Sequence, residues 1–327
     1  MSFLKSQLSK LNFELGRNPI FEMGDSALFI PEGYRSVVTI TADFELAWAW
    51  RYSKSVSDPL KRAVEKAESE RENLPLILKL CDKYMIPVTW ATVGHLFLSS
   101  CQPQNEIVHP EIKQIENFEN DYWSFSGKDW FEYDPCTDVN SAPHWYCPDL
   151  IEQIKDSVVK HEIGCHTFSH IDCSDNICSP DVISSELSEC IKLADLHGIK
   201  MKSFVHPGHT IGNLETISSF GFTSYQTDKN ILGYPEKKNN IWELKRTMEM
   251  TWREGWSEKY HIYRYKKIID KAVKTKSVCN LWFHPSMPSR FVNNILPSIF
   301  QHLHKLSESK DIYLSTAGSY IDYIDGK

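Results

Sequence analysis

The sequence predicts an α/β protein whose core is a (β/α) barrel of seven or eight strands. Segments rich in apolar and β-branched residues alternate with segments rich in helix-forming residues, and the joints between them are short. Strands that alternate with helices in this way form parallel sheets, which can close into barrels. Because no internal repeat or linker interrupts the alternation, residues 1–327 are interpreted as one barrel domain, with an N-terminal extension at 1–34 and an inserted substrate-side loop at 99–147.

The elements follow in order from local patterns. The first strand pattern, SVVTITADFE, begins as an apolar β-branched run and then alternates as a strand does when it leaves a core. The first helix pattern starts at Asp58 and Pro59 and is broken or restarts at Pro75. Strands are predicted at 36–45, 87–97, 162–168, 202–207, 222–228, 241–250, 278–285 and, alone or continuing into a helix, at 311–321. Helices are predicted at 58–86, 148–161, 179–198, 213–221, 263–277 and 290–310.

Composition and charge exclude several classes of protein. The formal net charge is −7 and basic residues do not cluster, so a nucleic-acid partner is not expected. No run approaches the roughly 18 apolar residues of a transmembrane helix. The first residues predict an amphipathic helix rather than a secretory signal. Together with nine scattered cysteines that form no C-x-x-C pair, this favours a cytoplasmic protein; the oligomeric state is left open.

Polar side chains recur where the predicted strands end. In a (β/α) barrel, the carboxyl ends of the strands meet at one face, where active sites are built. Packing alone does not readily explain such clusters on several separate strands. The residues concerned are Asp43, Glu45, His95, His166, His170, His206, His209 and His284.

Two of these clusters predict a metal site. Asp43 and Glu45 are two residues apart on a strand and share a face, where adjacent carboxylates repel each other unless a cation or proton lies between them. His166 and His170 are expected on one side of a helical turn, a spacing that can hold one metal ion. Two imidazoles and a carboxylate leave a position open for water, as in catalytic zinc sites.

Other interpretations of the same residues stay open at this point. Asp43 and Glu45 can be solvated in a loop, and the three cysteines near the histidine motif are further potential ligands. A lone histidine such as His284 is often a packing residue, although a hydrolytic metal site needs a proton donor and imidazole titrates in a suitable range.

In this arrangement the sequence resembles the polysaccharide deacetylase family, the NodB-type enzymes of carbohydrate esterase family 4. The resemblance consists of an aspartate and a second acid after the first strand, the segment TWATVGHLF, the H-[ST]-x-x-H motif in HEIGCHTFSH, and a late leucine followed by histidine. It extends from about residue 36 to 320 and implies a distorted NodB-like barrel with a divalent metal, usually Zn²⁺. By position, it makes Asp43 the catalytic base, His284 the catalytic acid, and Glu45, His166 and His170 the metal ligands.

The sequence departs from the family pattern in two places. Most members have adjacent aspartates, whereas DFE separates the two acids, so the roles of Asp43 and Glu45 can be exchanged. The family also has an arginine after the fourth strand that orients the base, and SFVHPGHTIGN contains none. The candidates to replace it are His206, His209, Arg246 and Arg253.

The long segment at 99–147 is rich in aromatic residues with interspersed acids and amides, which suits either a sugar-binding lid or a packed loop that only shields the barrel mouth. The expected sugar contacts are His95, Trp130, Asp134, Trp145, Tyr146, His206 and His209. The expected function is a metal-dependent hydrolase that removes an N-acyl group, such as acetyl, from an amino sugar. A cytoplasmic address favours a sugar-nucleotide or lipid-linked substrate in surface polysaccharide biosynthesis. The alternatives are an allantoinase-like or other small-amide hydrolase and an inactive sugar-binding relative.

Overall fold

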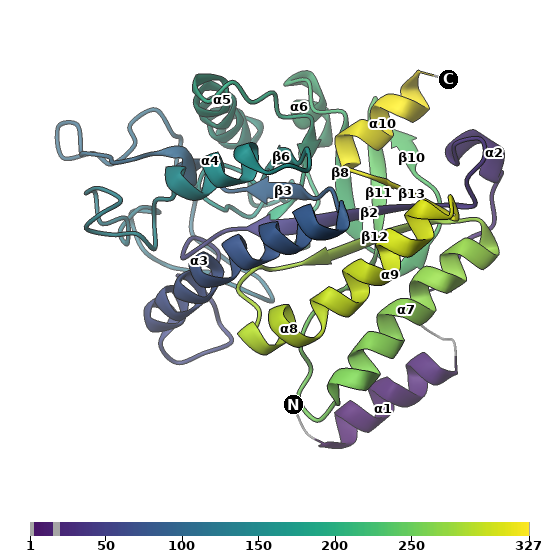
Figure 1. The fold of residues 1–327 in the computed structure, drawn as a ribbon. Helices are drawn as coiled ribbons and strands as arrows, with labels where there is room; N and C mark the ends of the chain where they lie inside the picture. Colours follow the sequence, from purple (N-terminus) through teal and green to yellow (C-terminus); the bar gives the residue numbers. More distant parts are fainter. Residues whose placement is uncertain (1–2, 16–19, 327) are drawn as a thin grey trace.

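The computed structural model describes residues 3–15 and 20–326, and its centre is a closed barrel of seven parallel strands (Figure 1). Each strand pairs with the next one of the barrel along the chain, and the last pairs with the first to close the ring. The barrel predicted from the alternation of strand and helix patterns is therefore confirmed. Its strands are β2 (Ser36–Phe44), β3 (Thr89–Thr92), β6 (Glu162–Cys165), β7 (Ser203–Phe204), β8 (Ser224–Asp228), β11 (Ile241–Glu249) and β12 (Val278–Phe283).

The barrel is distorted at its first strand. β2 pairs with β12 along one edge, and its other edge is shared by two partners. The last strand, β13 (Ile312–Ser315), pairs with residues 36–39, whereas β3 pairs with residues 41–44. Because a strand has only two edges, β13 and β3 follow each other along the same edge of β2.

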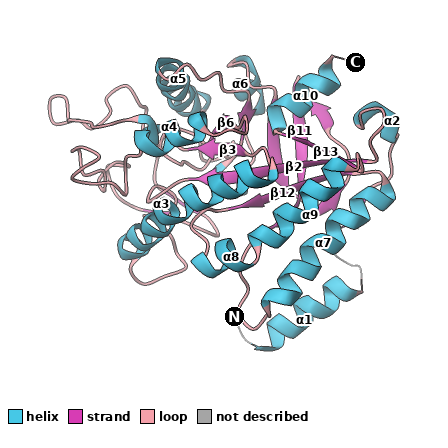
Figure 2. Ribbon diagram, in the orientation of Figure 1, coloured by secondary structure: helices cyan, strands magenta, loops and turns pink. Residues whose placement is uncertain are grey.

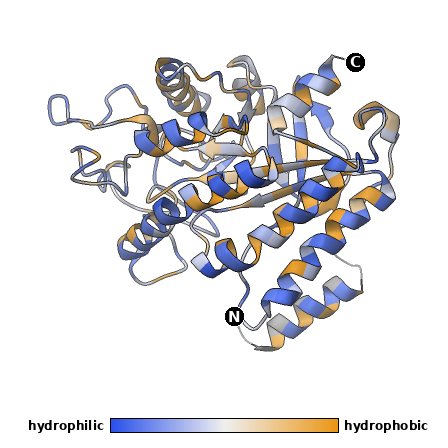
Figure 3. Cartoon of the chain, in the orientation of Figure 1, coloured by the Kyte–Doolittle hydropathy of each residue, from blue (hydrophilic) through white to orange (hydrophobic). Residues whose placement is uncertain are grey.

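Helices cover the outside of the barrel (Figures 1 and 2). In Figure 3 helices such as α7 and α9 carry both hydrophilic and hydrophobic faces, as expected of helices that pack on a sheet. Those that surround the strands are α3 (Pro59–Tyr84), α4 (Pro148–Asp156), α5 (Pro180–Leu196), α6 (Leu214–Ser219), α7 (Glu258–Thr275), α8 (Ser289–Asn294), α9 (Leu296–Glu308) and α10 (Ala317–Asp325).

Several predicted boundaries are corrected by the structure. Pro75 does not break α3, which runs through 26 residues. An interior proline costs about 3 kcal/mol, but burial of the neighbouring Leu74, Ile77 and Leu78 offsets it at roughly 1.5–3 kcal/mol each. The helix predicted at 290–310 is two helices that meet at Ile295. The final segment is a strand followed by α10, and the short β10 (Glu236–Lys238), which pairs antiparallel with β11, was not predicted.

The N-terminal extension lies outside the barrel. α1 (Phe3–Glu14) lies beside α7 in Figure 1, where the Tyr260 hydroxyl donates to the Lys10 carbonyl at 3.3 Å. β1 (Ile20–Phe21) pairs with β9 (Ile231–Leu232). The short helix α2 (Ser26–Phe29) comes after β1 along the chain. In the described part of the chain, no helix is long and apolar enough to cross a membrane.

The inserted segment at 99–147 is irregular but well packed. Its only regular elements among the described residues are β4 (Phe118–Glu119) and β5 (Ser124–Phe125), which pair antiparallel. Figure 2 shows these loops at the end of the barrel opposite α2 and α10. Most of its aromatic side chains are nevertheless buried, and Trp130 stacks on Tyr52 at 4.7 Å between ring centroids. The segment therefore shares one hydrophobic core with the barrel, and its division from the barrel stays a prediction.

Candidate metal centre and active site

Three predicted ligands converge at the carboxyl ends of β2 and β6. The Oε1 atom of Glu45 lies 3.0 Å from Nε2 of His166 and 3.1 Å from Nε2 of His170. All three residues are buried, and their nearest ligand atoms lie within 4.8 Å of one another. One divalent cation can contact a carboxylate oxygen and two imidazole nitrogens at such separations.

His166 and His170 do not lie on a helical turn, which corrects the geometry expected from their spacing. β6 ends at Cys165, and the following loop places Thr167 and His170 in the left-handed region, with φ of 59° and 57°. The buried Glu186 of α5 holds this loop, because its carboxylate accepts bonds from the Ser169 backbone N–H at 2.8 Å and from the Ser169 hydroxyl at 2.5 Å. The loop turns both imidazoles towards Glu45 where a helix was expected to do so.

Hydrogen bonding fixes how His166 faces the acid. Its Nδ1–H donates to the Val205 carbonyl at 2.7 Å, so in the neutral ring the lone pair on Nε2 faces the carboxylate. Burial lowers the pKa of His170 to about 4, so that this ring is neutral. A neutral imidazole lone pair against a carboxylate oxygen is unfavourable unless a cation lies between them. The donor set therefore fits a divalent metal.

Asp43 is paired with an arginine instead of the histidines. Arg246 of β11 donates from Nη2 to Oδ1 of Asp43 at 2.5 Å and from Nε to Oε1 of Gln226 at 2.9 Å. Its guanidinium also stacks on Trp282 at 4.3 Å. Burial raises the pKa of Asp43, but Arg246 and the neighbouring histidines outweigh it and hold the pKa below its usual value. Of the four candidates to replace the family arginine, the structure brings Arg246 to the aspartate.

His284 follows β12 and lies near two glutamates. Its Nε2 lies 3.8 Å from Oε2 of Glu45, and its Nδ1 lies 3.9 Å from Oε1 of Glu249. About a quarter of its side chain is exposed, at 26%, unlike the two buried histidines. His284 is thus the most exposed of the three histidines around Glu45.

A cavity of about 450 Å³ opens beside these residues. Asp43, Glu45, His170, His209 and His284 form its polar floor, and the remaining wall is partly aromatic. The wall residues are Ala49, Trp50, Ser53, Lys54, Ser55, Asp121, Tyr122, Trp123 and Gly208. The inserted segment thus supplies one side of the cavity and the barrel loops supply the other.

One glycine allows the two sides to meet. A Cβ atom on Gly208, which has φ of 53°, would lie 2.4 Å from the Trp123 ring. The Trp123 ring in turn packs edge-on against His170, with 5.1 Å between centroids. Position 208 therefore requires glycine both for its backbone conformation and for the close approach of the indole.

Six of the seven predicted sugar contacts lie outside this cavity. Of the seven, only His209 lines the cavity. Trp130 is buried and donates to the Ser169 hydroxyl at 2.9 Å, and buried His206 bonds to the Gly212 carbonyl at 3.0 Å. The other four, which gather in a separate polar cluster, are His95, Asp134, Trp145 and Tyr146. A strand-end position predicts the correct face of the barrel but not whether a side chain points into the cavity.

Two buried acids that sequence reasoning missed support the site. Glu70 of α3 accepts bonds from the backbone N–H groups of Glu45, at 3.2 Å, and Leu46, at 3.0 Å. Glu186 supports the histidine loop in the same way. Both lie on the apolar faces of their helices, where Glu70 falls between the buried Ala67 and Leu74. An acid on the buried stripe of an amphipathic helix is the signal by which they could have been found.

Comparison with known proteins supports the fold. No family model matches the sequence, and no curated protein compared with it matches either. The probable polysaccharide deacetylase from Pseudomonas aeruginosa PAO1 superimposes with a TM-score of 0.63 at 10% identity, covering 92% of this chain and 94% of that one. The Puue allantoinase superimposes with a TM-score of 0.61 at 13% identity, covering 92% and 93%. The expected NodB-like fold is thereby confirmed, and at such low identity the likeness extends to the fold alone.

Proposed function

We propose that this chain is a metal-dependent hydrolase that removes an N-acyl group, such as acetyl, from an amino sugar or a glycan precursor. The observation that carries the proposal is the convergence of Glu45, His166 and His170 beside the Asp43–Arg246 pair, next to a cavity that Asp43, Glu45 and His170 line. The fold, shared with structures described as polysaccharide deacetylases, supports the same conclusion.

Glu45, His166 and His170 would hold the metal, for which Zn²⁺ suits two imidazoles and a carboxylate. When bound, zinc supplies Lewis acidity towards the amide carbonyl and lowers the pKa of water to near 7. The contacts support Glu45 rather than Asp43 as the acidic ligand, because Glu45 meets both imidazoles while Asp43 is engaged by Arg246.

The remaining polar groups provide acid–base chemistry. Asp43, kept ionised by Arg246, accepts a proton from the attacking water. His284, whose Nε2 lies 3.8 Å from Glu45, donates a proton to the nitrogen of the departing amine. Cleavage of the C–N bond then releases a free amino sugar and a carboxylic acid.

The cavity supports a sugar as the substrate. Its volume of about 450 Å³ lies in the range of small-ligand sites. Trp50, Tyr122 and Trp123 provide flat apolar faces for a sugar ring, and Lys54 and Asp121 provide polar groups for hydroxyls. These residues take the place of the sugar contacts expected from the sequence.

The second candidate is an amide hydrolase of the allantoinase type. It is favoured by the Puue allantoinase, whose TM-score of 0.61 is close to that of the deacetylase structure. An inactive sugar-binding protein is less well supported, because that alternative depended on the missing arginine and Arg246 now contacts the aspartate.

A comparison of substrates tests these alternatives. Zinc-loaded protein is incubated with acetylated and deacetylated chito-oligosaccharides, with a nucleotide sugar that carries an acetamido group, and with allantoin. We expect acetate release from an acetylated sugar and no cleavage of the ureide. Ureide cleavage alone would favour the allantoinase-like function. His302→Ala is a matched control, since His302 pairs with Asp270 at 2.7 Å on the outer surface and does not line the cavity.

A further inference from the structure

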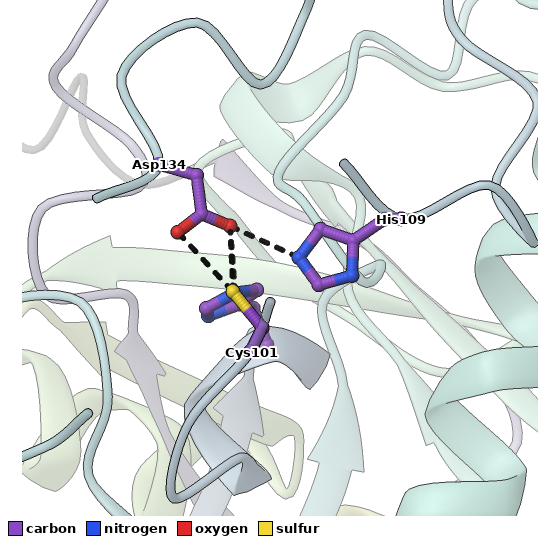
Figure 4. A group of neighbouring side chains, drawn as sticks. Cys101, His109 and Asp134 are labelled. Carbon is purple, nitrogen blue, oxygen red and sulfur yellow. Dashed lines mark hydrogen bonds and ion pairs between the residues drawn. The ribbon is translucent and has the colours of Figure 1, made fainter. Parts of the chain in front are cut away.

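A second group of potential metal ligands lies outside the proposed active site (Figure 4). Oδ2 of Asp134 lies 3.0 Å from Nε2 of His95, 2.9 Å from Nε2 of His109 and 3.5 Å from Sγ of Cys101. The ligand atoms of all four residues lie within 4.8 Å of one another. None of the four lines the cavity of the proposed active site.

The four side chains come from different parts of the chain. His95 belongs to the short 3₁₀ helix η1 (Gly94–Phe97), which follows the barrel strand β3. Cys101, His109 and Asp134 come from three separate points of the inserted segment at 99–147. Figure 4 shows Cys101 and His109 both directed at the Asp134 carboxylate. The cluster thus joins the inserted segment to the barrel.

Hydrogen bonds from surrounding residues orient the ligand side chains of this group. Nδ1 of His95 donates to the Trp145 carbonyl at 3.1 Å, and Nδ1 of His109 lies 3.3 Å from the Glu111 carboxylate. The other carboxylate oxygen, Oδ1 of Asp134, accepts bonds from the Tyr146 hydroxyl at 3.1 Å and from the backbone N–H of residue 136 at 3.0 Å. Metal-binding histidines characteristically donate their outer N–H in this way, which directs the second nitrogen at the ion.

A proton satisfies this group less well than a divalent cation. The Trp145 carbonyl can only accept a hydrogen bond, so Nδ1 of His95 carries a proton, and Nε2 of the neutral ring presents a lone pair to Oδ2 of Asp134. A proton on His109 would pair with Asp134 but would leave the lone pair of His95 facing the same carboxylate oxygen. One cation serves both imidazoles, the carboxylate and a thiolate together.

We propose that His95, Cys101, His109 and Asp134 bind a structural zinc ion that fastens the inserted segment to the barrel. Four protein ligands close the coordination shell, whereas catalytic zinc keeps a position for water. The side chains of His95 and Asp134 are fully buried, at 0% exposure, so the group is shielded from substrate. Such a crosslink suits a segment whose regular structure, in the described residues, is limited to β4 and β5. The inference does not depend on the proposed function.

Cobalt substitution distinguishes the two groups, because only the second contains a cysteine. Co²⁺ bound to a thiolate gives a charge-transfer band in the near ultraviolet, whereas Co²⁺ bound to Glu45, His166 and His170 does not. The variant Glu45→Ala/His170→Ala removes the proposed catalytic site and is titrated with Co²⁺ and then with Zn²⁺. We expect it to show the band, to retain one tightly bound zinc ion per chain, and to melt at a higher temperature when zinc is added.

Further variants assign the signal to the second group. Cys101→Ser is expected to abolish the band. It should also weaken zinc binding by at least roughly 10–100-fold, which is the usual loss when a residue that hydrogen-bonds to a metal ligand is removed. Cys147→Ser is the matched control, since this thiol lies at the end of the same segment and outside the ligand group, and the band should persist.

A folded double variant, judged by circular dichroism, that shows no band and no zinc-dependent stabilisation would overturn the proposal and leave a metal-free hydrogen-bonded cluster. If the double variant does not fold, the same band in the wild-type chain and its loss in Cys101→Ser decide the question. Failure of the deacetylase assay leaves this result unaffected, because no substrate is involved.

Discussion

Two polar clusters of this molecule are built alike and face different surroundings. In each, one carboxylate oxygen lies about 3 Å from two imidazole Nε2 atoms: Glu45 with His166 and His170, and Asp134 with His95 and His109. The first group opens onto a cavity beside Asp43 and His284. The second is enclosed by the inserted segment and completed by a thiol. The same donor set can therefore hold a catalytic or a structural metal ion. Which of the two it holds depends on whether water or a further protein ligand occupies the remaining coordination position.

The largest difference between the two clusters is expected for the variant His166→Ala. Loss of one imidazole leaves too few ligands at the first group, and we expect metal at that group and all measurable turnover to be lost. The thiolate–cobalt band of the second group should remain. Metal analysis, cobalt spectra and acetate release measure these effects. Unchanged turnover in a variant that has lost this metal would refute the catalytic assignment.

Asp43→Asn separates the base from the ligands. The amide cannot accept a proton, and kcat should fall about 10²–10⁴-fold, the usual contribution of general base catalysis. Metal content should be unchanged, because Asp43 contacts Arg246 instead of the histidines. Steady-state kinetics and metal analysis are compared on the same preparation. If turnover persists and metal is lost, Asp43 and Glu45 have the exchanged roles.

Arg246→Gln tests the pairing of Asp43 with Arg246 through the pH profile of kcat/KM. Arg246 lowers the pKa of Asp43, so its removal should raise that pKa. A base acts only above its pKa, and the acidic limb of kcat/KM should therefore move to higher pH, with a smaller loss at alkaline pH. Arg253→Gln is the control, because this side chain lies over Trp256 and does not line the cavity. An unshifted acidic limb in Arg246→Gln would contradict the pairing.

The smallest effect on chemistry is expected from His109→Ala. If the second group holds zinc, bound zinc adds about 2.7 kcal/mol to the free energy of unfolding when the free zinc concentration is about a hundred times its Kd. The variant should lose this stabilisation. Because Trp123 of the same segment forms part of the cavity wall, KM should rise while kcat stays within about tenfold of the wild type. Thermal melts with and without zinc, together with kinetics, check both points. A loss of kcat as severe as in His166→Ala would remove the distinction between the two groups.

The sequence by itself determined the barrel and the face on which the acids and histidines meet. Strand and helix periodicities are local, and in a parallel barrel the end of each strand has a fixed place, so Asp43, Glu45, His166, His170 and His284 could be brought together from the sequence. Their approach was predictable although the local geometry of the histidine loop was not. That loop depends on Glu186 of another element.

Only the tertiary structure decided which distant residues complete each group. Arg246 lies 203 positions from Asp43, and no local pattern distinguishes it from Arg253. Likewise, Cys101, His109 and Asp134 lie in a segment without periodicity, and they meet His95, which precedes that segment. The path of an irregular segment is set by long-range packing, here by its buried aromatic side chains, and not by backbone preferences that can be read residue by residue.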